Sequence, residues 1–169
     1  LIKHTRHYFM DFLQRKDPYT EKVCHPRSDW RVQDIITHLT WSDEQATAEI
    51  NALLEDRVLV QPPHLQICCP DDVHRRNAWI RRERYNYSPA KVMSDFKDEH
   101  ETFKNALFRI GNNRLFKEFT ASWGERVTPQ DIAIWQIQHD QYHHRDLSKS
   151  MGCPQHLDNR VLGLIRTKM

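Results

Sequence analysis

Apolar residues recur every three or four positions over about residues 32–54, which is the spacing of an amphipathic helix. One face of this helix carries an apolar stripe formed by Ile35, Leu39, Ala46 and Leu53. Near the start of the chain, a shorter stretch predicts another helix, which ends before Asp17-Pro18. Its apolar residues are Tyr8, Phe9, Phe12 and Leu13.

Two further helices are predicted by capping residues that directly precede a proline. Ser88-Pro89 and Thr128-Pro129 each place an N-cap side chain before a proline suited to the first helical position. The second start also has Asp131 three residues after the cap, a short version of the capping box. The helix from Pro89 is expected to stop near Gly111, and its apolar residues are Val92, Phe96, Phe103 and Leu107. A weaker helical piece is predicted near "NRVLGLIR", residues 159–166.

The connection between the second and third of these helices, about residues 55–88, is long for a helical bundle. It contains several prolines and then the basic run "VHRRNAWIRRERYNY". The short segments "RVLVQ" and "HLQICC" within it fit either loop or a minor strand pair. The pattern therefore predicts an all-α fold, a four-helix bundle with a long crossover connection between helices 2 and 3. A length of 169 residues suits a single domain over 1–169.

Composition narrows the functional classes. Hydrophobic residues make up 38% of the chain and charged residues 28%, which is typical of a soluble globular protein. A net charge of +2 is too weak to indicate a nucleic-acid or membrane partner, and the apolar runs are too short to span a membrane. With only 4 glycines there is no Gly-rich phosphate loop, which argues against a Rossmann or P-loop nucleotide site.

The four cysteines, Cys24, Cys68, Cys69 and Cys153, form no C-x-x-C pair. We interpret them as free thiols in a reducing cytoplasm. The segment "CPQH", residues 153–156, contains two potential metal ligands, but a turn at Pro154 is the favoured interpretation.

The main chemical signal is "IWQIQHDQYHHRDL", residues 134–147, which places His139 and His143 about 40° apart on a helix. Two imidazoles one turn apart can reach a single divalent ion. A third ligand has to come from another helix, and His38 in "DIITHLTWSDE" is the best candidate. The residues placed to support the ligands or to line a cleft beside them are Gln136, Tyr142, Asp146, Ser42 and Glu49. The alternative is a chance pair among 11 histidines, each satisfying a hydrogen bond.

The segment "RSDWRVQDIITHLTWSDE", followed about a hundred residues later by "HDQYHHRDL", resembles the DinB/YfiT-like superfamily of damage-inducible four-helix proteins. This resemblance implies a bundle with a crossover connection, a homodimer, and a divalent zinc or nickel ion held by three histidines. By position these are His38, His139 and His143. Asp140 stands where the family often has Glu, and the usual Arg-Gly-Gln is replaced by residues 144–146, "HRD".

Three protein ligands leave coordination positions open, as in catalytic sites. The resemblance to the DinB/YfiT-like superfamily further implies a metal-dependent stress or detoxification enzyme acting on a small molecule, either a transferase that uses a low-molecular-weight thiol or a hydrolase. The alternative is a non-catalytic, stress-induced binding or structural protein in which the metal staples the helices or the site is vacant. A zincin-type peptidase is less favoured because Asp140 is one methylene shorter than the glutamate of H-E-x-x-H. Asp140 itself is expected to be an exposed charge, and no catalytic residue is assigned.

Nucleic-acid binding is a weaker alternative. It depends on arginines interleaved with stacking rings in the basic run: Arg75, Arg76, Arg81, Arg82 and Arg84 with Trp79, Tyr85 and Tyr87. The same run fits a solvated loop entering a helix, balanced by the acids of "SDFKDEHE". Trp41 and Trp135 are expected to be packing side chains rather than parts of a substrate site.

Overall fold

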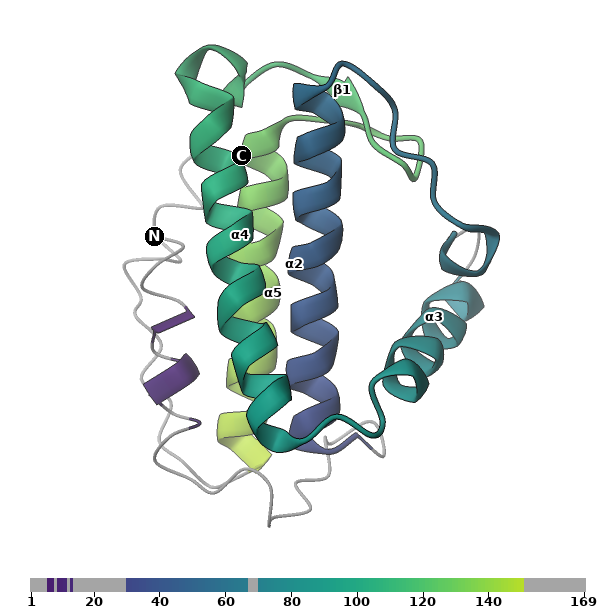
Figure 1. Ribbon diagram of the computed structural model, residues 1–169, viewed down its shortest axis with the longest axis vertical. Coiled ribbons are helices and arrows are strands. Elements are labelled where there is room, and N and C mark those ends of the chain that lie inside the picture. Colours follow the sequence, from purple (N-terminus) through teal and green to yellow (C-terminus); the bar gives the residue numbers. More distant parts are fainter. Residues whose placement is uncertain (1–5, 8, 12, 14–29, 67–69, 151–169) are drawn as a thin grey trace. The chain divides into compact units, whose positions relative to one another are not determined.

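A computed structural model describes residues 6–7, 9–11, 13, 30–66 and 70–150 (Figure 1). These residues belong to two units, which we describe separately: Gln33–Gln136, and the described residues up to Val32 together with those from Ile137. Most described residues are helical, which confirms the all-α class. The described residues also include a pair of short strands, β1 (Phe119–Thr120) and β2 (Arg126–Val127), each two residues long. The four-helix bundle with its crossover, and a single domain over 1–169, stay predictions.

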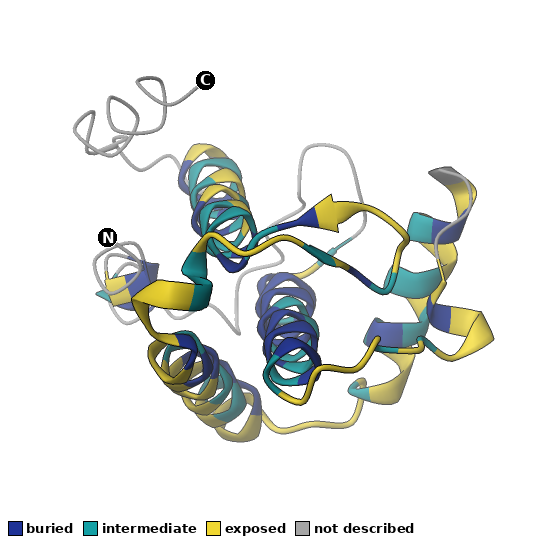
Figure 2. Ribbon diagram, turned by 90° about the horizontal axis from the view of Figure 1, so that it is seen from above, coloured by how far each residue is buried: buried dark blue, intermediate teal, exposed yellow. Residues whose placement is uncertain are grey.

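Helix α2 (Val32–Leu54) has the extent that its apolar pattern predicts. Ile35, Leu39 and Ile50 are completely buried, and several polar residues of the same helix are largely buried as well. In Figure 2 the ribbon of this helix is dark blue, the colour of buried residues, around much of its circumference. Thr40 satisfies its hydroxyl within the helix by donating to the carbonyl of Ile36 at 2.9 Å.

Helix α4 (Pro89–Leu115) begins at the predicted cap, where the Ser88 hydroxyl accepts a hydrogen bond from the amide of Lys91 at 3.2 Å. Its buried apolar residues include Val92, Phe96, Phe103 and Ile110. Gly111 has φ 67° and ψ 169°, a conformation that breaks the helix and favours glycine. The main helical segment therefore ends where the sequence predicts, and residues 112–115 form a further helical turn.

Helices α2 and α4 run side by side in the same direction (Figure 1). The His100 Nδ1 atom lies 3.2 Å from a carboxylate oxygen of Asp43, and Arg109 donates to the Asn51 side chain at 3.4 Å. The contact with the higher residue number on α4 thus also has the higher residue number on α2, as expected for two helices that run in the same direction.

The connection between α2 and α4 contains a helix that the sequence analysis did not predict, α3 (Pro70–Glu83), which follows the short 3₁₀ helix η1 (Pro63–Leu65). The expected loop is therefore helical over most of the basic run. The side chain of Ile80 from α3 packs with Leu65 and Trp41. The described residues of "RVLVQ" and "HLQICC" form no strand. All four cysteines and the "CPQH" segment lie outside the described residues.

Helix α5 (Pro129–Ser150) starts at the predicted capping box. The amide of Asp131 donates to the Thr128 hydroxyl at 3.1 Å, and the amide of Thr128 donates back to the Asp131 carboxylate at 2.8 Å. An antiparallel hairpin precedes this helix and pairs Phe119 with Val127. Gly124, at φ 89°, forms its turn.

The described residues between 6 and 13 are helical, and Phe9 and Leu13 are buried there. The predicted end of that helix before Asp17, and the predicted piece at 159–166, lie outside the described residues. Within the described part of the chain, each helix is too short or too polar to cross a membrane. The cytoplasmic location stays a prediction.

Candidate metal centre

His139 and His143 lie one turn apart on α5, and their rings approach each other closely. Their Nε2 atoms are 3.1 Å apart, and the ring centroids are separated by 4.8 Å. Two nitrogens that bind one ion at about 2.0–2.1 Å stand about 2.9 Å apart in an octahedral site and about 3.3 Å apart in a tetrahedral one. The observed spacing falls between these values. This pair therefore has the geometry of two ligands of one ion.

His38, the third ligand predicted from the sequence, is buried on α2 with 8% of its surface exposed. Each of the three histidines offers a ring nitrogen, and these nitrogens all lie within 4.8 Å of one another. Rotation of the rings about their side-chain torsions can shorten such a distance by an ångström or more, toward the spacing of two nitrogens that bind one ion. In the described part of the chain, this group contains three imidazoles and no carboxylate. Three close histidines can thus bind a divalent metal ion.

Ser42 and Gln136 hold each other through two hydrogen bonds. The Ser42 hydroxyl donates to the Gln136 side-chain oxygen at 3.0 Å, and the Gln136 amide group donates to the Ser42 carbonyl at 3.1 Å. Ser42 follows His38 by four residues and Gln136 precedes His139 by three, which is about one helical turn in each case. The pair therefore ties α2 to the first turns of α5 at the level next to the ligand-bearing positions.

Asp140 is not the exposed charge that the sequence analysis expected. Only 2% of this residue is exposed, and one of its carboxylate oxygens lies 3.0 Å from Nε of the equally buried Arg6. Arg6 is 134 residues away in the chain, so no local pattern indicates the contact. A buried carboxylate oxygen engaged by a guanidinium is poorly placed to take a proton from a substrate, so Asp140 is a poor candidate for a general base. The structure thus assigns Asp140 to the support of α5 beside the histidines.

Glu49, expected to support the ligands or line a cleft, lies eleven residues from His38 on α2, about 16 Å along the helix. Its carboxylate accepts hydrogen bonds from the Ser122 amide at 3.1 and 3.3 Å and so holds the β1–β2 turn. Burial raises the pKa of Glu49 above its usual value, and the hydrogen bonds from Ser122 oppose this rise. These contacts rule out direct support of the His38 ring.

Tyr142 lies beside the histidine pair. Its ring meets the His143 ring edge to face at a centroid distance of 5.2 Å, while 40% of the residue remains exposed. Asp146 is half-buried on the same helix, one turn after His143. Its role in supporting the ligands stays a prediction.

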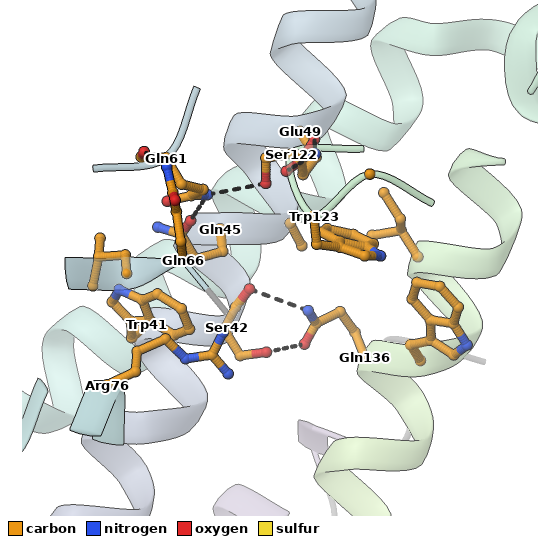
Figure 3. A pocket seen from close by; sticks show the side chains of 15 residues that line it. Trp41, Ser42, Gln45, Glu49, Gln61, Gln66, Arg76, Ser122, Trp123 and Gln136 are labelled. Atoms are coloured by element: carbon orange, nitrogen blue, oxygen red, sulfur yellow. Dashed lines mark hydrogen bonds between the residues drawn. The ribbon is translucent and has the colours of Figure 1, made fainter. Parts of the chain in front are cut away.

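A cavity of about 650 Å³ lies within the Gln33–Gln136 unit (Figure 3). Ser42, Glu49 and Gln136 line it, while their expected place at a cleft beside the histidines stays a prediction. Trp41 and Trp135 line it as well. Trp41 also packs in the apolar cluster with Leu65 and Ile80, as expected, whereas Trp135 is 42% exposed. Sequence reasoning did not connect Arg76, Ser122 and Trp123 with this cavity, because its walls come from separate segments that only the tertiary fold brings together.

The basic run has acidic partners that differ from the expected "SDFKDEHE" segment. The pairs are Arg75 with Asp72, Arg81 with Asp34, and Arg84 with Glu44. These acids belong to α2 and α3, and they neutralise much of the positive charge on which the nucleic-acid hypothesis depends. The absence of nucleic-acid binding stays a prediction.

Comparison of the chain with models of protein families, with curated proteins and with solved structures finds no match. The geometry of the histidine side chains therefore carries the case for a metal centre. Membership of the DinB/YfiT-like superfamily stays a proposal that the sequence motifs support.

Proposed function

We propose that this protein is a metal-dependent enzyme of the DinB/YfiT-like type, with a zinc or nickel ion held by His38, His139 and His143. The observation that supports this most directly is the grouping of three ring nitrogens within 4.8 Å. Imidazole nitrogen is a ligand that suits both zinc and nickel. Metal binding requires neutral imidazole rings, and the rings of His38 and His143 belong to buried residues.

A catalytic role is favoured over a purely structural one by the small number of ligands. An ion with three protein ligands keeps positions open for a substrate or a thiol and supplies Lewis acidity there. Within the described residues, the cluster has no fourth histidine or acid that would close the site. The proposed reaction is therefore the transfer of a low-molecular-weight thiol to a small electrophile, or the hydrolysis of a small molecule.

The chain's own residues contribute position rather than proton transfer. The Arg6–Asp140 ion pair anchors α5 next to His139, and the Ser42–Gln136 pair fixes α2 against α5 one turn away. Rigid support of this kind keeps ligand rings in the orientation that a bound ion needs.

Metal analysis of protein purified without an affinity tag tests the site. We expect close to one zinc or nickel ion per chain, and loss of most of that metal in His143→Gln. The control His74→Gln changes an exposed histidine of α3 and should retain the metal. A wild-type protein that takes up neither metal after incubation with both would contradict the proposal, and so would His143→Gln protein with a full complement of metal.

Turnover distinguishes the enzyme from the non-catalytic alternative. Metal-loaded protein is mixed with a low-molecular-weight thiol and an aryl halide, and separately with an activated ester. Catalysis at this site would be supported if the metal-loaded wild type turns over a substrate and His143→Gln does not, even after addition of zinc or nickel. A fully loaded protein inert toward both substrates would favour the structural protein.

The proposed homodimer is checked on the same samples by analytical ultracentrifugation.

A further inference from the structure

We propose that the cavity of the Gln33–Gln136 unit binds a planar organic carboxylate, with its ring against tryptophan side chains and its carboxylate on Arg76 (Figure 3). This inference goes beyond the proposed function. It requires no ion at the histidines, so the two can fail separately.

The cavity has the size and walls of a small-molecule site. Its volume of about 650 Å³ falls in the range of pockets that enclose metabolite-sized ligands. Trp41, Trp123 and Trp135 all line it. Trp123 and Trp135 are each 42% exposed, and their ring centroids lie 5.9 Å apart at an interplanar angle of 50°. Ring surface left open at a cavity wall can stack on a planar ligand.

Most polar side chains of the cavity are already paired with one another. Ser42 and Gln136 exchange two hydrogen bonds, as described above. Gln61 donates to the Gln45 side chain at 2.5 Å and to the Ser122 hydroxyl at 3.3 Å. In Figure 3 the contacts of Gln61 are seen in the upper part of the view and those between Ser42 and Gln136 below them. These residues shape the cavity, but their pairing leaves the recognition of a ligand's charge to other groups.

Glu49 and Arg76 are the charged residues that line the cavity. Glu49 is 1% exposed and directs both carboxylate oxygens to the amide of Ser122. Its charge is therefore engaged by the protein backbone. Arg76 is the group that remains for a ligand.

Arg76 differs from its neighbours in the way it is held. Its guanidinium lies 4.6 Å from the centre of the Trp41 ring, and its Nε atom is buried without a hydrogen-bond partner in the described part of the chain. Burial lowers its pKa from the usual value, a sign of lost hydration. Arg75 and Arg84, by contrast, each have a carboxylate partner.

A partly desolvated guanidinium with unused donors gains most from an anion that matches its planar fork, and a carboxylate does so with two parallel hydrogen bonds. A single positive charge balances the single charge of a carboxylate. A phosphate dianion would instead leave excess negative charge near Glu49. The tryptophan surfaces add the requirement for a flat apolar ring. Together these features define an aromatic or heteroaromatic carboxylate.

Isothermal titration with 2-naphthoate tests this inference, with EDTA present so that metal binding plays no part. We expect saturable binding to the wild type and an affinity lower by about tenfold or more in Arg76→Gln, since a charge-assisted pair is lost. The control Arg75→Gln removes a neighbouring charge whose side chain is 77% exposed, and its affinity should stay within about twofold of wild type. The uncharged 2-naphthamide should bind more weakly than 2-naphthoate and be insensitive to Arg76→Gln.

Three results would overturn the inference: no saturable binding of 2-naphthoate at millimolar concentration, equal affinity for the acid and the amide, or equal losses in the two arginine variants. Trp135→Leu covers the possibility that Arg76→Gln does not fold, because Trp135 is an exposed side chain. It should weaken the acid and the amide alike. Unchanged binding of both to Trp135→Leu would contradict stacking in the cavity.

Discussion

Replacement of Glu49 by glutamine is expected to stabilise the protein near neutral pH. The side chain is 1% exposed, and burial raises the pKa of its carboxyl group because the charged form has lost its water. Glutamine has nearly the same shape and keeps one oxygen that accepts from the Ser122 amide. The variant therefore retains the contact with the β1–β2 turn and removes the buried charge.

The pH dependence follows from proton linkage. The pKa of Glu49 in the folded protein lies above its value of 4.5 in the unfolded chain, so the folded state holds the proton more tightly. The stability contributed by this group is complete below pH 4.5 and is lost as the pH rises through the folded pKa. Between the two pKa values, the free energy of unfolding of the wild type falls by up to about 1.4 kcal/mol per pH unit relative to that of Glu49→Gln. Above the folded pKa the difference stays constant.

Urea unfolding of both proteins at intervals of half a pH unit from 4 to 8 measures this difference directly. We expect the free energy of unfolding of the wild type to fall relative to the variant over the lower part of this range. A wild type that gains stability relative to Glu49→Gln as the pH rises would refute the reasoning. It would mean that the hydrogen bonds from Ser122 outweigh the loss of hydration.

Two further predictions concern stability. Asp140→Ala should lower the free energy of unfolding by about 3–5 kcal/mol, since it removes the partner of the buried Arg6, whereas Glu118→Ala in the exposed pair with Arg126 should cost less than about 1 kcal/mol. Urea titration compares the two, and similar losses would show that the Arg6 pair is not effectively buried. Thr128→Ala should cost about 1 kcal/mol by removing the N-cap of α5, and an unchanged thermal unfolding midpoint would contradict that role.

The parts of the fold that could be predicted from the sequence are those encoded by local signals. The apolar spacing of α2 lies within the helix itself, and the caps at Ser88 and Thr128 act over three residues. Helix α3 gives a weaker signal, because a largely basic, polar segment presents few apolar side chains, and of these Ile80 is buried against Leu65 and Trp41. The two-residue strands of the hairpin are too short to show an alternation.

The candidate site was predictable to a similar extent. The spacing of His139 and His143 indicates two ligands on one helix face, and the position of His38 on the edge of an apolar face indicates a third. The burial of Asp140 depends on Arg6, far away in the sequence, and the exposure of Arg76 to a cavity depends on how α3 packs. Contacts between distant segments leave no periodic pattern, so their partners cannot be predicted from spacing.

The central claim is that three imidazole nitrogens bind one ion. X-ray absorption at the metal edge of protein loaded with a single equivalent of zinc or nickel measures this directly. We predict a first shell that includes three imidazole nitrogens at about 2.0–2.1 Å and at least one position filled by solvent, with one imidazole missing in His38→Gln. A first shell without imidazole, a shell dominated by sulfur, or an unchanged spectrum in His38→Gln would contradict the claim.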